Sequence, residues 1–191
     1  MSDHFEPAPE PINELARAAR AKATGLMDAE PSVHFQHFAS WARESSHCAG
    51  AYISILDDTQ QKILGIDFGD HKDGAVPASE RSRSLAQYAL LSYQPKIVPD
   101  LREHPILKSH PLVVSSTAWV FWAAFPLITR DGLVLGAMTV MDYKPQHLSD
   151  DVIDEWRLIA GNISDLINNI AAEQQHCLRD GNPVPTADAA E

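Results

Sequence analysis

The chain has 191 residues, of which 45% are hydrophobic, and its formal net charge at pH 7 is −11. This length and apolar fraction suit a single globular domain with a buried core. The negative charge disfavours a nucleic-acid-binding surface, for which a basic stripe is expected.

Two further features narrow the class of protein. The two cysteines, Cys48 and Cys177, are too few for a disulfide scaffold and are expected to be reduced thiols. No window approaches the ~20 consecutive apolar residues of a membrane span, and the acidic, proline-rich N-terminus is unlike a signal peptide. We therefore expect a cytoplasmic protein without a membrane partner.

The first fifty residues predict two helices. Residues 1–10 carry prolines and charges without periodicity and are expected to be disordered. Pro11 suits the first turn of a helix, and apolar residues at helical spacing continue that helix to about Asp28. Ser32 can cap a second helix, which is expected to end at Gly50.

A hairpin and a short helix follow. Residues 51–56 read as a strand that turns at residues 57–58 into a second strand at residues 62–68. A polar stretch then leads to a short helix at residues 84–91, and Pro95 stops any helix beyond it.

Residues 96–116 combine prolines with apolar residues. The prolines forbid a long helix or a central strand, while the apolar residues argue against a solvated linker. A long ordered segment without regular structure is typical of a lid or wall over a functional site. The prolines at or beside this segment are Pro95, Pro99, Pro105 and Pro111.

Residues 119–142 give the strongest strand signal. Two apolar runs rich in aromatic and branched side chains flank a polar break that ends in Asp131-Gly132, which is typical of a β-hairpin. Because polar residues are nearly absent from both runs, each strand should be covered on both faces. The hairpin is therefore expected at the centre of a sheet.

The length of the hairpin loop decides which side chains share a face, because a slip of one residue moves every side chain to the other face. A two-residue loop would place Phe125 opposite Met138. A three-residue loop, with Gly132 at positive φ, would place Phe125 opposite Ala137, and we favour this loop. One face would then present Trp119, Phe121, Ala123, Phe125, Ala137, Thr139 and Met141. The other would present Val120, Trp122, Ala124, Gly136, Met138 and Val140.

A long amphipathic helix closes the chain. Ser149 can cap it, and Asp150 and Asp151 favour its positive end. Two neighbouring apolar stripes suggest that it is buried on two sides. The second stripe would pack on a second subunit or on the N-terminal helix, and both options stay open. Residues 175–191 are polar and are expected to form a disordered tail.

Three segments together resemble a GAF domain over approximately residues 32–170. They are IVPDLREHPILKSHPLV, AAFPLITRDGLVLGAMTVMDYKP and LSDDVIDEWRLIAGNISDLI. The resemblance rests on the order and spacing of a set of positions. These are Val98-Pro99-Asp100, Phe125-Pro126-Leu127, Gly132, Gly136, Asp142, Pro145 and Leu148.

The resemblance implies an α+β, GAF/PAS-like fold for residues 11–174. A central antiparallel sheet of about six strands would carry the N- and C-terminal helices on one face. The short helix and the irregular segment 96–116 would cover the other face and leave a small-molecule pocket. Family members bind cyclic nucleotides, tetrapyrroles, small metabolites or no known ligand, and most relay occupancy to an attached output domain. Too few residues follow the last helix here to form one, so a separate output protein is expected.

The implied pocket combines aromatic walls, small floor residues and a few polar groups, which is typical of ligand sites. As an alternative, the aromatic side chains close this space, and the domain serves only for dimerisation. The ligand-binding residues expected from the resemblance are Tyr52, Ser54, Tyr88, Asp100, Trp119, Phe121, Ala123, Phe125, Ala137 and Thr139.

The reactive residues disfavour an enzyme. A covalent bilin needs a cysteine in the wall or short helix, and a free methionine sulfoxide reductase needs thiolates at the pocket; neither Cys48 nor Cys177 lies there. His104, His110 and Asp100 match no rigid metal-ligand spacing, so no metal is expected. The sequence thus predicts a sensory protein in signal transduction, homodimeric through its terminal helices, with an unidentified ligand.

Overall fold

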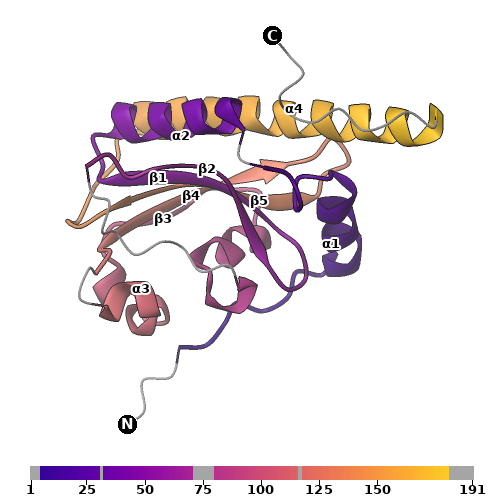
Figure 1. Ribbon diagram of the computed structural model, residues 1–191. Helices are drawn as coiled ribbons and strands as arrows, with labels where there is room; N and C mark the ends of the chain where they lie inside the picture. Colours follow the sequence, from indigo (N-terminus) through magenta and orange to yellow (C-terminus); the bar gives the residue numbers. More distant parts are fainter. Residues whose placement is uncertain (1–4, 31, 71–79, 116–117, 181–191) are drawn as a thin grey trace.

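A five-stranded antiparallel sheet lies between two layers of helices (Figure 1). The computed structural model describes residues 5–30, 32–70, 80–115 and 118–180. The strand order is β2-β1-β5-β4-β3, so the β4–β5 hairpin occupies the interior of the sheet, as the sequence predicts. The described residues hold five strands, one fewer than the approximate number expected. They are β1 (Gly50–Leu56), β2 (Gln61–Asp67), β3 (Lys96–Val98), β4 (Phe121–Ile128) and β5 (Val134–Asp142).

Helices α2 (Val33–Ser46) and α4 (Asp150–Asp180) cover one face of the sheet, which we call the helix face, and α1 (Glu14–Ala23) packs beside β5 and β1. The opposite face is covered by a series of short helices, which we call the wall. The wall consists of η1 (Arg81–Arg83), η2 (Leu85–Leu91), η3 (Leu101–Glu103), η4 (Leu107–Ser109) and α3 (Pro111–Val114). This two-sided covering matches the predicted α+β architecture.

The helix face holds a core of large apolar side chains. Phe125 of β4 meets Trp156 of α4 edge to face, with ring centroids 5.5 Å apart at an interplanar angle of 78°. Both side chains are fully buried. The indole N–H of Trp156 donates a hydrogen bond to the Ser45 hydroxyl over 3.2 Å, so its polar atom is satisfied inside the core.

The β4–β5 turn has the three-residue loop that the sequence predicts. The backbone N–H of Thr129 donates to the Leu133 carbonyl over 2.9 Å, and the N–H of Gly132 donates to the Thr129 carbonyl over 2.9 Å. Gly132 has a φ of 78°, a conformation that glycine adopts at little cost. The loop therefore ends at the glycine, as expected.

A β-bulge follows the turn. Ile128 pairs with Val134, but Leu127 pairs with Gly136, so Leu135 is an extra residue in β5. Gly136 lies so close to β1 that a Cβ there would collide with the backbone of Ser54. A glycine inside a strand often marks such a bulge or close approach.

The bulge shifts the register of the hairpin by one residue. Phe125 pairs with Met138, and the predicted pairing with Ala137 was wrong although the loop length was right. The face assignment of β4 is reversed as a result. Phe121, Ala123 and Phe125, expected at the pocket, belong to the core of the helix face, whereas Trp122 and Ala124 lie under the wall.

The outer edge of the sheet is closed by a side chain. Strand β2 is an edge strand. The amide group of Gln36, on α2, donates to the Ile66 carbonyl over 2.7 Å and accepts from the Ile66 N–H over 3.3 Å. The Gln36 side chain thus occupies the backbone groups that a further strand would use.

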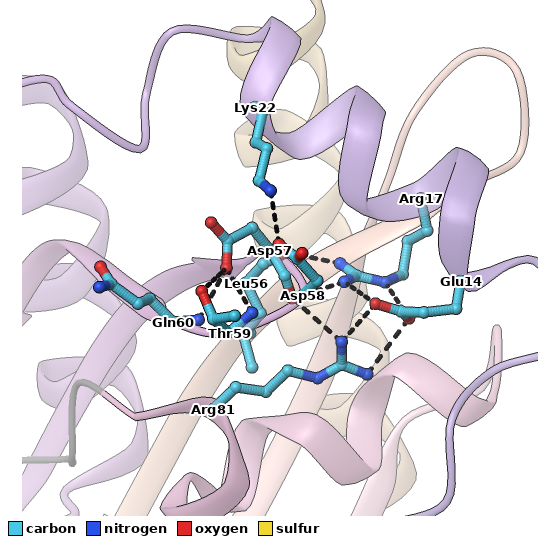
Figure 2. A network of polar contacts seen from close by, with 9 residues as sticks. All are labelled: Glu14, Arg17, Lys22, Leu56, Asp57, Asp58, Thr59, Gln60 and Arg81. Carbon is cyan, nitrogen blue, oxygen red and sulfur yellow. Dashed lines mark hydrogen bonds and ion pairs between the residues drawn. The ribbon is translucent and has the colours of Figure 1, made fainter.

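An ionic network fastens α1 to the β1–β2 turn and to the wall (Figure 2). Arg17 is fully buried and donates to the carbonyls of Leu56 over 2.5 Å and Asp57 over 2.7 Å. The Glu14 carboxylate pairs with Arg17 over 2.8 Å and with Arg81 of the wall. Burial would raise the pKa of Glu14, but the two guanidinium groups hold this pKa below its usual value.

The N-terminal segment lies against the wall. Residues 5–10, for which the sequence predicts disorder, make defined contacts. The Tyr88 hydroxyl donates to the Glu6 carbonyl over 2.7 Å, and the Ala8 N–H donates to the side chain of Gln87 over 3.0 Å. These contacts hold residues 5–10, which we call the strap, against the wall.

The ends of the chain differ from the predicted boundaries. Helix α4 continues to Asp180, beyond the expected end of the domain at residue 174. The rest of the predicted tail and residues 1–4 lie outside the described residues. Within the described part of the chain, no helix has both the length and the apolar character needed to span a bilayer.

Candidate functional site

The centre of the sheet under the wall is built from small side chains. Thr139 of β5 pairs with Tyr52 of β1 and with Ala124 of β4, while Ala137 pairs with Ser54. Residues paired across antiparallel strands point to the same face. Ser54, Ala124, Ala137 and Thr139 therefore form a patch of small residues, which we call the floor.

Buried polar atoms without partners surround this floor. Side-chain atoms on four adjacent strands (β2, β1, β5 and β4) are shielded from solvent, and none reaches a hydrogen-bond partner among the described residues. We call these residues the polar row. Its atoms are both amide atoms of Gln61, Tyr52 Oη, Ser54 Oγ, Thr139 Oγ1 and Trp122 Nε1.

Tyr52 lies at the middle of the polar row. Burial raises the pKa of its phenol to about 12, and the neighbouring side chains of Thr139 and Gln61 oppose this rise. Neither neighbour meets the geometry of a hydrogen bond to Tyr52 Oη. At neutral pH, Tyr52 therefore keeps its proton and offers both a donor and an acceptor.

The wall covers the floor with fully buried apolar side chains. Leu85 of η2, Leu101 of η3 and Leu107 of η4 have no exposed surface. Trp119, a predicted site residue, is also fully buried and stacks on Tyr143 with ring centroids 4.2 Å apart. The interface between the wall and the sheet thus has polar atoms on the sheet side and apolar side chains on the wall side.

Two predicted site residues occupy the rim of the wall. Tyr88 of η2 belongs to the same buried cluster as Tyr52, but its hydroxyl points to the strap. Asp100 caps η3, accepting from the Arg102 N–H over 3.0 Å, and pairs with the Arg102 guanidinium over 2.6 Å. Asp100 therefore acts in the structure of the wall and does not join the polar row.

The two wall histidines also cap local structure. His104 Nδ1 accepts the backbone N–H groups of Ile106 and Leu107 over 3.2 and 3.1 Å. His110, which is fully buried, caps α3 by accepting the Leu112 N–H over 3.1 Å. In the part of the chain that the structure describes, no three side chains of His, Cys, Asp or Glu gather where they could hold a metal ion.

The buried His110 ring is held in its neutral form. Its Nε2 lies 3.1 Å from the Arg83 carbonyl, and the Phe5 ring of the strap packs edge-on against it at 4.4 Å. Burial lowers the pKa of His110 to about 4, although the Arg83 carbonyl favours the protonated ring. With Nδ1 accepting, the proton of the neutral ring lies on Nε2.

Neither cysteine lies at the floor. Cys48 is buried in the core of the helix face, and Cys177 lies near the end of α4. Burial raises the pKa of the Cys48 thiol to about 11, so the thiolate is scarce at neutral pH.

The sequence identified part of the polar row and missed the rest. Tyr52, Ser54 and Thr139 were expected at the pocket and do lie under the wall. Gln61 was not considered, and Trp122 was placed on the wrong face because of the register error. Gly136 was the available signal, since an internal strand glycine warns of a bulge.

Comparison with known proteins establishes the family. A family model described as a GAF domain matches residues 29–168, which is most of the chain. The protein therefore belongs to the GAF domain family.

A curated relative matches over part of its length. The chain is 28% identical over 141 residues to a cyclic di-GMP phosphodiesterase of Pseudomonas aeruginosa. That match covers 72% of this chain and 23% of the relative, so the chain spans about a quarter of the relative's length.

Solved structures show the same fold. The PixJ GAF domain of Thermosynechococcus elongatus, in its blue-light-absorbing form, has a TM-score of 0.60 at 13% identity, covering 88% of this chain and 95% of that one. The GAF domain of an Acinetobacter phosphoenolpyruvate-protein phosphotransferase has a TM-score of 0.58 at 12% identity, covering 90% and 98%. At such identities the likeness concerns the fold alone.

Proposed function

We propose that this GAF domain is a cytoplasmic sensory module that binds a small molecule between the sheet and the wall. The observation that carries the proposal is the polar row: six buried polar atoms without a hydrogen-bond partner among the described residues. Leaving a buried donor or acceptor unsatisfied costs about 1–3 kcal/mol, so a cluster of them calls for a ligand or water to satisfy it.

Contacts at one end of the sheet support transmission of occupancy to α4. Glu14 joins Arg81 of the wall to α1, and Arg20 of α1 pairs with Asp131 in the β4–β5 turn over 2.5 Å. In the same turn, Arg130 donates to Asn169 of α4 over 2.9 Å. A shift of the wall on binding would therefore reach α4 through defined contacts; such coupling requires that the ligand favour one of two states.

The signal would pass to a second copy of the chain and from there to an output domain or protein. A hollow of about 370 Å³ opens at α2 and α4, lined by His34, His37, Phe38, Trp41 and Leu166. Apolar side chains on the same two helices are exposed: Val33 by 66%, Trp41 by 47% and Leu158 by 71%. These features support a homodimer through the terminal helices.

A second candidate function is a dimerisation module that binds no ligand. The observation that favours it is the complete burial of Leu85, Leu101 and Trp119, which fill the space under the wall. In that case the polar row would be satisfied by water alone.

We propose neither thiol catalysis nor covalent bilin attachment. Cys48 is buried on the far side of the sheet with a raised pKa, and Cys177 lies on α4, so neither supplies a nucleophile at the floor.

Native mass spectrometry of protein purified from cells tests the main proposal. We expect a bound small molecule in the wild type and its loss in Ala137→Leu, which fills the floor. Ala172→Leu on the exposed side of α4 is the matched control and should retain the ligand. If the wild-type protein carries no ligand and no metabolite in a screen raises its melting temperature, the dimerisation module would be supported instead.

A further inference from the structure

A row of paired residues runs from the edge of the sheet to the polar row. Lys96 of the edge strand β3 pairs with Ala124, Ala124 pairs with Thr139, and Thr139 pairs with Tyr52. All four residues point to the wall face. A lysine therefore stands at one end of the floor and a phenol at the other.

Lys96 has no carboxylate partner among the described residues. No ion pair of the described chain includes it, although acidic residues outnumber basic ones by 26 to 15. Its ammonium group lies 5.2 Å from the centre of the Tyr88 ring, which belongs to the buried cluster under the wall. Partial burial lowers the pKa of Lys96, and no carboxylate in the described part of the chain raises it.

The other charged groups of the wall are already engaged or exposed. Arg81 is paired with Glu14, and Arg102 is paired with Asp100. Burial lowers the pKa of His104, and the positive charge of Lys96 lowers it further. A half-buried cation without a counter-charge is costly and favours an anion beside it.

We propose that the ligand of this site carries an anionic group, a carboxylate or a phosphate, that Lys96 binds, and an uncharged part that reaches Thr139 and Tyr52. This inference rests on the proposed function. No atom of the polar row bears a charge at neutral pH. The uncharged part of the ligand would therefore satisfy these atoms with hydrogen bonds.

The row also bounds the size of the ligand. Three steps between strands separate Lys96 from Tyr52, and each step is about 4.8 Å, which gives about 14 Å between their backbones. The lysine side chain spans part of this length. The remaining distance suits a single aromatic or heterocyclic ring bearing one acidic group.

Lys96 also has a simpler structural explanation. Lysine on an edge strand discourages pairing with other strands, and its ammonium group gains from the face of Tyr88. In that case Lys96 would not change which probes the site binds. A set of matched probes separates the two explanations.

The probes are benzoate, phenyl phosphate and benzamide, which share a ring and differ in charge. The readout is the indole N–H signal of Trp122 in a ¹⁵N-correlated NMR spectrum, assigned with Trp122→Phe. The indole of Trp156 serves as an internal control, because it is bonded to Ser45 on the helix face. We expect at least one anion to shift the Trp122 signal with at least tenfold higher affinity than benzamide, and the stronger anion identifies the acidic group.

Variants of Lys96 complete the test. Lys96→Met should abolish the preference for the anion, Lys96→Arg should keep it, and Lys108→Met, at an exposed lysine of the wall, should leave it unchanged. Equal affinity for benzamide and the anions, or an unchanged preference in Lys96→Met, would overturn this inference and leave the proposed function standing. A Trp122 signal that no probe shifts would also overturn this inference, whereas the proposed function is decided by the native mass spectrometry.

Discussion

Two fully buried tryptophans on opposite faces of the sheet show how the two layers differ. Trp156 packs against Phe125 on the helix face and donates its indole N–H to Ser45. Trp122, under the wall, is as deeply buried, but its indole N–H has no partner among the described residues. The helix face is a satisfied core, whereas the wall face keeps hydrogen-bonding capacity that the described chain does not use.

This difference separates stability from function in the same sheet. A core of satisfied, apolar side chains gives up free energy whenever it is truncated. Buried polar atoms without hydrogen bonds destabilise the folded state, so removing them raises the free energy of unfolding. Truncating an apolar side chain on the helix face should therefore lower the free energy of unfolding, whereas removing a polar atom of the polar row should raise it.

The largest loss is expected on the helix face. Phe125→Ala removes a fully buried ring that packs on Trp156 and should lower the free energy of unfolding by about 4 kcal/mol. Chemical denaturation measures this change. Val114→Ala, at an exposed position, is the control and should change stability by less than about 0.5 kcal/mol. A small loss for Phe125→Ala would mean that the helix face is not the main core.

A somewhat smaller loss is expected where the two layers are joined. Glu14→Gln leaves the buried Arg17 and Arg81 without a counter-charge and should lower the free energy of unfolding by about 3 kcal/mol. Asp154→Asn, in an exposed ion pair with Arg157, should have little effect. Equal effects of the two variants in denaturant titrations would show that the buried network does not stabilise the fold.

The wall itself should weaken in acid because of His110. Its pKa is about 4 in the folded protein and 6.5 as the ordinary value, so the unfolded chain binds more protons. The contribution of His110 is complete above pH 6.5 and is lost as the pH falls toward 4. This corresponds to about 2 kcal/mol between about pH 7 and about pH 5.

Comparison with His110→Asn isolates this effect, because asparagine can still cap α3 and does not titrate. As the pH falls across this range, the free energy of unfolding of the wild type should decrease relative to that of the variant. Urea unfolding at each pH measures this difference. A difference between the two proteins that is independent of pH would contradict a buried neutral imidazole.

The smallest effect is the most direct test of the comparison. Thr139→Val removes a hydroxyl that has no hydrogen-bond partner among the described residues, at nearly constant volume. It should raise the free energy of unfolding of the ligand-free protein by about 1 kcal/mol. Thr129→Val should lower it by about 1 kcal/mol, because this hydroxyl accepts the Leu133 N–H over 2.9 Å. Differential scanning calorimetry on both variants should show opposite shifts. Destabilisation by both would mean that Thr139 is satisfied in the native state.

Local chemistry made most of the fold predictable. Gly132 predicted the turn, because few other residues adopt positive φ. The near absence of polar residues from 119–128 predicted that β4 lies inside the sheet. The family resemblance supplied the layers on either side. The long α4 was predicted from its apolar periodicity, whereas the strand order outside the central hairpin was not predicted.

The site was less predictable, because it depends on register and on contacts between distant residues. The extra residue Leu135 reversed the face of Phe121, Ala123 and Phe125, and only Gly136 hinted at it. The contacts of the strap with Tyr88 and Gln87 span about eighty residues of sequence. Lys96 likewise has no carboxylate partner among the described residues, and this depends on tertiary contacts that its sequence neighbours do not reveal.

The amide of Gln36 has a consequence for the behaviour of the protein in concentrated solution. By bonding both backbone groups of Ile66, it imitates an extra strand and denies the outer margin of β2 to a neighbouring molecule. Its loss would expose a template for ordered self-assembly. One side chain on α2 thus shields part of this edge from pairing with a strand of another molecule.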